Sequence, residues 1–325
     1  MHRRHALITL AAQAAGWACA GAAQAQAGTG RPVRLIVPFT PGGSTDILAR
    51  AIAPGLGAGL GSTVVIDNKP GAGGSLGATE AARAEPDGRT RLMGHIGTLA
   101  VNPSLYPKLG YHPIDSFAPV AWVARVPNVL VVEAASPART VQEFIDLARA
   151  RPGQWSYSSG GNGSAAHICF EYFKLVTRVF MLHIPYRGTA PSITDLLAGQ
   201  VQATFTGAPA VLPHVRSGRL RALAVSSTQR IAALPQVPTL AESGYPGFEA
   251  DQWYGVVVPA GTPHEVVARL NGLINQTLVQ PEVARQLAGE GAIAMPGTPQ
   301  AFGDLITREI PRWREVVRVG RVTAD

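Results

Sequence analysis

One strand–turn–helix pattern occurs twice in this chain, and each copy turns at a run of glycines. The first copy joins an apolar run at 33–38 to a helical pattern through Phe39-Thr40-Pro41-Gly42-Gly43-Ser44-Thr45-Asp46. The second joins 155–158 to another helical pattern through Ser159-Gly160-Gly161-Asn162-Gly163-Ser164. We call these turns the first elbow and the second elbow. A helix start carries N–H groups without backbone partners at the positive end of its dipole, so two elbows facing one cleft predict a clamp for a small anion.

The pattern continues beyond the elbows and predicts an α/β fold. Apolar runs of strand length alternate with helical patterns, as in parallel strands joined by crossover helices. The chain is long for one core and suits two domains. We therefore expect two parallel-rich sheets flanked by helices, with the loops 68–75 and 185–189 beside the elbows at the carboxyl ends of the strands. The expected strands are 33–38, 64–66, 92–95, 155–158, 179–184 and 202–206.

Two further segments look alike and indicate where the chain changes lobes. Apolar runs at 129–132 and 255–258 each precede a helical pattern, and each is typical of a strand that crosses between lobes. We expect hinges near 122–125 and 224–227, and hinge closure about these two strands. A last helix, apolar from Phe302 to Trp313, is expected to dock on lobe one. The predicted division is lobe one at 28–124 and 225–325, and lobe two at 125–224.

The first residues predict export. A basic start that includes Arg3 and Arg4, an apolar run at 6–20 and the small-x-small sequence Ala25-Gln26-Ala27 are typical of a secretory signal peptide at 1–27, which indicates a periplasmic location. Cys169 is then the only mature cysteine, so no internal disulfide is expected. The net charge of +7 is dispersed without a basic run or an aromatic ladder, which argues against a nucleic-acid partner.

The candidate ligand-binding residues cluster at the two elbows. Gly42 and Gly43 permit positive φ and a close approach of backbone to ligand, and Asp46 lies in the first helical turn. An ordinary capped turn is the alternative. Arg187 either pairs with a carboxylate or faces solvent, and Asp251 either meets an ammonium group or caps a turn. The full set is Phe39, Thr40, Pro41, Gly42, Gly43, Asp46, Ser158, Ser159, Gly161, Asn162, Gly163, Ser164, His167, Arg187 and Asp251.

Patterns expected of an enzyme, a metal site or a cofactor site do not emerge. The mature histidines lack metal-ligand spacing, no Gly-x-Ser-x-Gly occurs, and the glycine-rich loop 69–75 lacks the Gly-Lys-Ser/Thr of a phosphate loop. Cys169 lies among apolar residues, as a core residue does. We expect a binding protein without catalytic residues, cofactor or metal. An enzyme on the same fold and a ligand-sensing subunit for a membrane kinase are the alternatives.

At these residues the sequence resembles the Bug family of solute receptors, the binding components of tripartite tricarboxylate transporters. The resemblance implies a periplasmic, type II-like Venus-flytrap protein that delivers a small carboxylate to membrane transporter subunits. It also implies that the ligand is held largely by backbone donors and ordered water, and we expect a monomer. The segments that carry it are 38–46, 67–74, 161–164 with His167, 185–188 and 235–246.

One departure from the family pattern bears on the ligand. Many relatives carry an aspartate at the strand end after the lobe-two helix, where this chain has Phe205-Thr206-Gly207. The family takes dicarboxylates, tricarboxylates, amino acids and aromatic acids. The resemblance therefore implies a class of ligand, and the individual compound stays open.

Overall fold

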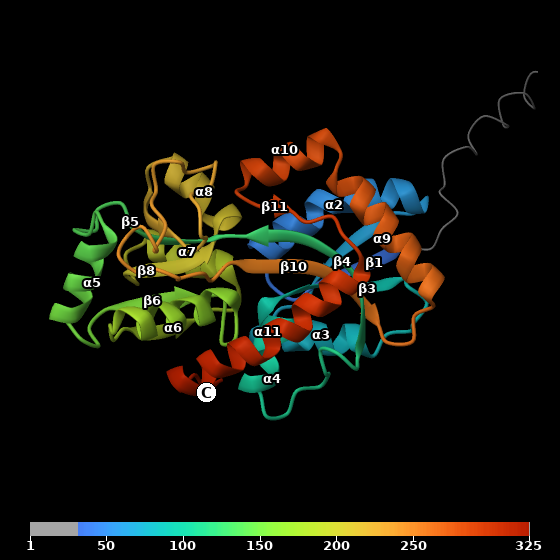
Figure 1. Cartoon of the computed structure of the whole chain (residues 1–325), viewed down its shortest axis with the longest axis horizontal. Coiled ribbons are helices and arrows are strands. Elements are labelled where there is room, and N and C mark those ends of the chain that lie inside the picture. The colour runs from blue at the N-terminus through green and yellow to red at the C-terminus, as the bar shows by residue number, and fades with distance from the viewer. Residues whose placement is uncertain (1–31, 325) are drawn as a thin grey trace, which may run out of the picture.

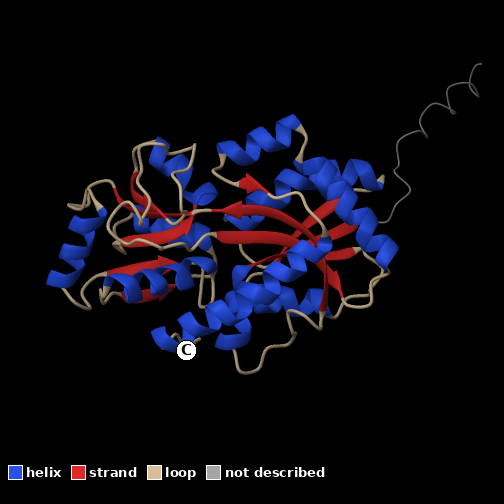
Figure 2. Ribbon diagram, viewed as in Figure 1, coloured by secondary structure: helices blue, strands red, loops and turns tan. Residues whose placement is uncertain are grey.

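Two helix-flanked sheets lie side by side in the computed structural model, which describes residues 32–324 (Figure 1, Figure 2). The predicted signal peptide at 1–27 lies outside the described residues. The first sheet has six strands in the order β11-β4-β10-β3-β1-β2, and the second has five in the order β7-β6-β8-β5-β9. The bilobal α/β architecture expected from the repeated pattern is thus present.

Lobe one contains the first sheet. Its strands are β1 (Val33–Val37), β2 (Val64–Asn68), β3 (Thr90–His95), β4 (Phe117–Val126), β10 (Gln252–Pro259) and β11 (Ile293–Ala294). Its helices are α2 (Ser44–Leu60), α3 (Ser75–Ala82), α4 (Asn102–Leu105), α9 (His264–Leu278), α10 (Pro281–Gly289) and α11 (Pro299–Gly320), with short turns η1 (Ala72–Gly74) and η2 (Gly97–Val101).

Lobe two contains the second sheet and four helices. The strands are β5 (Asn128–Glu133), β6 (Ser156–Ser159), β7 (Leu182–Pro185), β8 (Ala203–Gly207) and β9 (Leu220–Val225). The helices are α5 (Val141–Ala150), α6 (Ala165–Thr177), α7 (Thr189–Leu197) and α8 (Ala208–Arg216).

Both sheets are mixed, which corrects the expectation of parallel-rich sheets. The strands next to the elbows are parallel as predicted: β1 pairs with β2 and β3, and β6 pairs with β7 and β8. The strands that link the lobes run the other way, because β10 is antiparallel to β3 and β4, and β5 is antiparallel to β8 and β9. A strand that enters a sheet from the neighbouring lobe has no crossover helix to make it parallel.

The lobes are joined by two adjacent strands. β4 passes through Pro127 into β5, and β10 returns from lobe two paired along most of β4 (Figure 1). The segment before β10 packs with lobe two, because Ile231, Leu234 and Val237 belong to the apolar cluster of that sheet. From this packing we propose that the second crossing between the lobes lies at the start of β10, after the hinge expected near 224–227.

The last helix packs on both lobes. α11 contacts β4 and η2 in lobe one and α6 in lobe two. Trp313, which is 1% exposed, stacks edge-on against Tyr172 of α6 and donates from Nε1 to Glu309 Oε2 at 2.8 Å. The apolar cluster that holds Trp313 continues through Phe173 and Phe205 of lobe two. The docking of this helix therefore extends beyond the lobe-one surface expected from its sequence.

Arg91 in β3 is a buried cation whose Nε and Nη1 have no hydrogen-bond partner among the described residues. It is 2% exposed, and burial lowers the pKa of its guanidinium to about 10, with Asp87 opposing and Arg89 adding to that effect. Arg91→Met removes an uncompensated buried charge and keeps an apolar side chain of adaptable shape. We expect urea titration to give a free energy of unfolding raised by roughly 1–3 kcal/mol.

The matched control is Arg308→Met on α11, where the arginine is exposed. This change should leave the free energy of unfolding within about 0.5 kcal/mol of the starting value. A destabilised Arg91→Met variant would mean that the guanidinium contributes favourable contacts in the folded protein.

Candidate functional site

Each elbow approaches the opposite lobe across the boundary between the lobes. A Cβ placed on Gly43 would lie 3.4 Å from the Thr189 Cβ at the start of α7. Farther along the rim, Tyr106 of lobe one donates from its hydroxyl to the Asn162 carbonyl of lobe two at 2.8 Å. A side chain on Gly73 would overlap that same carbonyl. Glycines thus let the backbones of the two lobes approach closely.

A small inner cavity of ≈ 20 Å³ lies where α2 of lobe one and α6 of lobe two begin. A cavity of this size holds about one water molecule, so an organic ligand requires the lobes to separate. Of the predicted site residues, Phe39 and Ser164 line it. The complete wall is Phe39, Ser44, Thr45, His95, Ser164, Ala165, Ala166, Thr189, Thr206, Gln252 and Tyr254.

Both helix starts open onto this inner cavity. The N-cap of α2 is Gly43, and no side chain caps this end. The N-cap of α6 is Ser164, whose hydroxyl accepts from His167 N at 3.3 Å. The first two N–H groups of each helix, at 44 and 45 and at 165 and 166, have no acceptor within their own helix. Residues 44, 45, 165 and 166, at the starts of helices from the two lobes, all line this cavity.

The first elbow is held in shape by Asp46. Its Oδ2 accepts from Gly42 N at 3.0 Å and from Arg50 Nε at 2.9 Å, and its Oδ1 accepts from Asn68 Nδ2 at 3.1 Å. Burial alone would raise the pKa of this carboxyl, but the hydrogen bonds from Arg50, Gly42 and Asn68 outweigh it and lower the pKa. Gly42 has φ +84°, as expected, whereas Gly43 has φ −85°, which corrects the predicted positive φ there.

The second elbow also satisfies its own glycine N–H groups. Gly161 donates to Ser159 Oγ at 3.1 Å, and Gly163 donates to His167 Nδ1 at 3.1 Å. Burial, with the nearby charges of His183 and Lys174, lowers the pKa of His167 to about 2, so this ring is neutral. The glycine N–H groups of the elbows brace the loops. The candidate donors to a ligand are instead the first helical turns.

Nine of the eleven wall residues were absent from the predicted set. Three of these nine lie outside the elbows, the helices that follow them, the loop 185–189 and the strand end 205–207: His95, Gln252 and Tyr254. His95 ends β3, and its ring stacks on Phe39 at 4.7 Å between centroids and meets Tyr254 edge-on at 5.8 Å. His95 lies at the carboxyl end of a parallel strand, where α/β sheets bind their ligands, so its position in the sequence could have indicated a site residue. Gln252 and Tyr254 belong to an antiparallel strand, and nothing in their local sequence marks them.

A larger outer cavity of ≈ 390 Å³ adjoins the rims of both lobes. Phe39 lines both cavities and lies between them. Arg187 is exposed at this outer cavity, and Gly161 and Asn162 contribute to its wall, so these predicted residues lie beside the inner cavity and not in it. The others line neither cavity: Thr40, Pro41, Gly42, Gly43, Asp46, Ser158, Ser159, Gly163, His167 and Asp251.

Comparison with known proteins decides the family. Residues 48–320 match the model of the tripartite tricarboxylate transporter family receptor, TctC. The chain belongs to this family. It is 42% identical over 289 residues to protein BugT of Bordetella pertussis, covering 89% of each chain.

Solved structures agree with this assignment to the TctC family. MatC from Rhodopseudomonas palustris, with bound malate, has a TM-score of 0.85 and 34% identity and covers 89% of this chain and 99% of its own. A second R. palustris protein, with adipate, has a TM-score of 0.88 and 38% identity and covers 91% and 99%. The predicted Bug-family resemblance and the bilobal binding-protein fold are confirmed.

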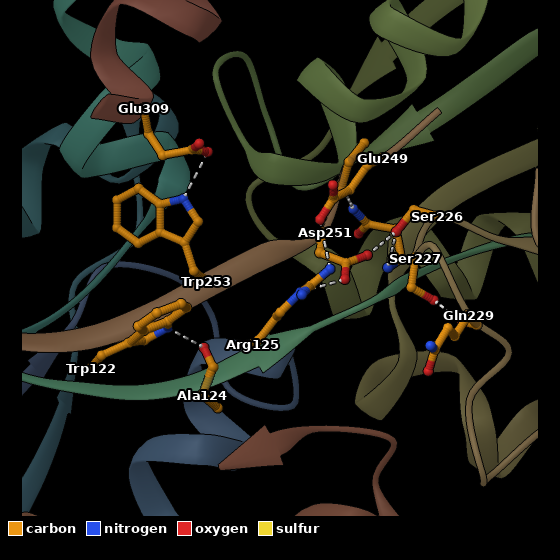
Figure 3. Close-up of polar contacts among 12 residues, drawn as sticks. Trp122, Ala124, Arg125, Ser226, Ser227, Gln229, Glu249, Asp251, Trp253 and Glu309 are labelled. Atoms are coloured by element: carbon orange, nitrogen blue, oxygen red, sulfur yellow. Dashed lines mark hydrogen bonds and ion pairs between the residues drawn. The ribbon is translucent and has the colours of Figure 1, made fainter. Parts of the chain in front are cut away.

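In this family member the hinge between the lobes is a polar network (Figure 3). Arg125 of β4 donates from Nε to Asp251 Oδ2 at 2.8 Å and from Nη2 to Glu249 Oε1 at 2.6 Å. Ser226 donates to Asp251 Oδ1 at 2.6 Å. Burial raises the pKa of Asp251, and the bonds from Ser226 and Arg125 oppose this. The Asp251 carboxylate is thus engaged at the hinge.

The hinge network continues to the inner cavity through neutral groups. Asn128 donates from its backbone N to Ser226 Oγ at 2.8 Å, and its side chain accepts from Gln252 Nε2. Gln252 in turn accepts from the hydroxyl of Tyr254. Hydrogen bonds therefore connect the wall of the cavity with the residues that join the lobes.

The arrangement closest to a catalytic pair is Ser159 Oγ and His183 Nε2, 2.6 Å apart. Ser159 is fully buried, His183 is half-buried, and neither residue lines the two cavities between the lobes. Cys169 is 1% exposed in the core of α6, as predicted. Within 32–324 no group of acidic, histidine or cysteine side chains is arranged to hold a metal ion. No helix of that same region is long and apolar enough to cross a membrane.

Proposed function

We propose that this protein is a periplasmic receptor that captures a small carboxylate between its lobes for uptake by a tripartite tricarboxylate transporter. The observation that carries this proposal is the convergence of two helix starts, one from each lobe, on one cavity. Each helix start is equivalent to about half a positive charge, and its free N–H groups suit carboxylate oxygens. Family membership and the structural neighbours that hold malate and adipate support the same class of ligand.

Binding then requires the lobes to open and close. The inner cavity is too small for a dicarboxylate as it stands, so the ligand enters an open form. One carboxylate accepts hydrogen bonds from the first turns of α2 and α6, which draws the lobes together. The paired strands β4 and β10 provide the flexible connection. The outer cavity, with Arg187 at its rim, leaves room for the rest of a longer ligand.

The partners and location follow from the same proposal. The signal-peptide pattern at 1–27 and the family both favour the periplasm, where the receptor, a monomer, meets the membrane subunits of the transporter. The family model describes a receptor, and MatC holds malate, which favours binding without turnover over an enzyme on the same fold. Co-purification with the membrane subunits of a transporter would support a transport role, whereas co-purification with a membrane kinase would support a sensor role.

We expect small carboxylates to stabilise the mature protein and to be recovered unchanged. A ligand at a hundred times its dissociation constant adds about 2.7 kcal/mol to the free energy of unfolding because it binds only the folded state. Thermal melting with a panel of mono-, di- and tricarboxylates, including malate and adipate, measures this. Mass spectrometry of the incubated ligands tests for turnover. A panel that leaves every melting temperature unchanged contradicts the proposal, and conversion of a ligand favours an enzyme.

A further inference from the structure

The wall of the inner cavity is polar but carries no charged side chain. Of its eleven residues, all within the described chain, none is Asp, Glu, Lys or Arg. Its polar groups are hydroxyls, the amide of Gln252, the imidazole of His95 and the two helix starts. Within the wall itself, the positive partial charges are those of the two helix starts, each equivalent to about half a unit charge.

Acidic residues adjoin this wall in sequence, yet they are bound elsewhere. Asp46 follows Thr45, and its oxygens accept from Gly42, Arg50 and Asn68 inside the first elbow. Asp251 precedes Gln252, and its oxygens accept from Arg125 and Ser226 at the hinge. Both carboxylates are thus engaged outside the cavity, and neither residue lines it.

His95 adds a neutral donor to this wall. Its Nδ1 accepts from Gly97 N at 2.7 Å and from Thr98 N at 3.3 Å, so the proton of the neutral ring is on Nε2, at the opposite edge. Burial lowers the pKa of His95 to about 4, so the ring stays neutral near pH 7. A fixed N–H donor can bind a carboxylate or hydroxyl oxygen, whereas it opposes an ammonium group.

We propose that this receptor selects carboxylates that lack an ammonium group on the carbon next to the bound carboxylate, and that it rejects the corresponding α-amino acids. Such an ammonium group shares a carbon with the carboxylate and must enter the same cavity. There it would lose water, meet two positive helix ends and find no acid. A hydrogen or a hydroxyl at that carbon meets no such penalty. This inference rests on the proposed carboxylate-binding function.

The test compares each straight-chain carboxylate with its own α-amino counterpart by calorimetry. The pairs are succinate with L-aspartate, glutarate with L-glutamate, adipate with 2-aminoadipate and propionate with L-alanine, and L-malate is the hydroxyl analogue of L-aspartate. We expect the amino acid of each binding pair to bind at least ~100-fold more weakly. An amino acid that binds within ~3-fold of its partner, or more tightly, overturns this inference and leaves the carboxylate receptor standing. Binding by none of these compounds overturns both.

Thr206 offers a matched pair of variants. It lies at the carboxyl end of β8, is 3% exposed and lines the cavity. Thr206→Asp introduces the missing acid and should shift the ratio of amino-acid to carboxylate affinity by at least ~10-fold toward the amino acid. Thr206→Asn has nearly the same shape without the charge and should keep the original ratio. Equal shifts in both variants would attribute selection to shape and contradict the electrostatic account. Melting curves establish whether each variant is folded. If a variant does not fold, the comparison of paired ligands on the unaltered protein still tests the inference.

Discussion

Replacing Gly43 by valine is expected to lower carboxylate affinity by ~100-fold or more, equivalent to about 2.7 kcal/mol. Gly43 has an extended backbone that any residue adopts, so the fold is not strained. In the closed protein, however, its Cβ position lies only 3.4 Å from Thr189 of the other lobe. The two methyl groups of valine would collide there and hold the helix starts apart. Calorimetry with the ligand found in the melting panel measures the loss.

Small-angle scattering separates blocked closure from a damaged site. The unaltered protein should show a smaller radius of gyration with saturating ligand, whereas Gly43→Val should stay open. Gly272→Val in α9 is the control, because no atom lies within 4 Å of a Cβ placed there. Normal affinity in a folded Gly43→Val protein would show that the lobes need not meet at this point. Gly161→Val is a less direct test, since Gly161 has φ +116° and faces Tyr186 of its own lobe.

Acidification from pH 7 to pH 5 is expected to destabilise the fold by roughly 4 kcal/mol through two histidines. Burial lowers the folded-state pKa of His95 to about 4 and that of His167 to about 2, below the ordinary value of 6.5. Below pH 6.5 these two histidines are therefore protonated in the unfolded chain but remain neutral in the folded protein. The contribution of each histidine to the free energy of unfolding is fully present above that pH and decreases as the pH falls, by about 2 kcal/mol at pH 5. Urea titrations at the two pH values measure the loss.

The two histidines can be separated by substitution. His167 stacks on His183 with centroids 3.8 Å apart, so His167→Phe preserves the stacking while removing the titrating group. Between pH 7 and pH 5, the free energy of unfolding of this variant should fall by about 2 kcal/mol less than that of the unaltered protein. His264→Phe changes an exposed histidine and should retain the full loss. A His167→Phe variant with unchanged pH dependence would mean that other groups cause the acid destabilisation.

The sequence predicted the elements around the elbows well, because local signals specify them. β1 and β6 each lead through a glycine-containing turn into a helix, α2 or α6, as predicted. Ser164 caps α6, whereas no side chain caps α2. The direction of the linking strands was not predictable in this way. Whether β10 is parallel or antiparallel to its neighbours depends on the lobe from which the chain returns. The sequence of Gly255–Val258 is compatible with either direction.

The candidate site was predicted at the level of loops and only partly at the level of atoms. Of the predicted ligand-binding residues, Phe39 and Ser164 line the inner cavity, and their role in binding stays a prediction. Backbone N–H groups of the elbows were expected to bind the ligand, but those of Gly42 and Gly163 donate within the elbows to Asp46 and His167. Such contacts depend on side-chain rotamers that sequence spacing does not specify. Gln252 and Tyr254 reach the cavity only because a strand from the far end of the chain is inserted between β3 and β4.

The apolar cluster shared by the lobes bears on how receptors of this kind can diversify. Trp313 and Phe302 of α11 belong to the same cluster as Phe173 and Phe205 of lobe two. A chimera that takes lobe two from one relative and the remainder from another would mismatch these faces, so the lobes are poor units of recombination. Single residues at strand ends, such as Thr206, touch the cavity without supporting either core. Ligand preference can therefore diverge by point substitution while the architecture is inherited whole.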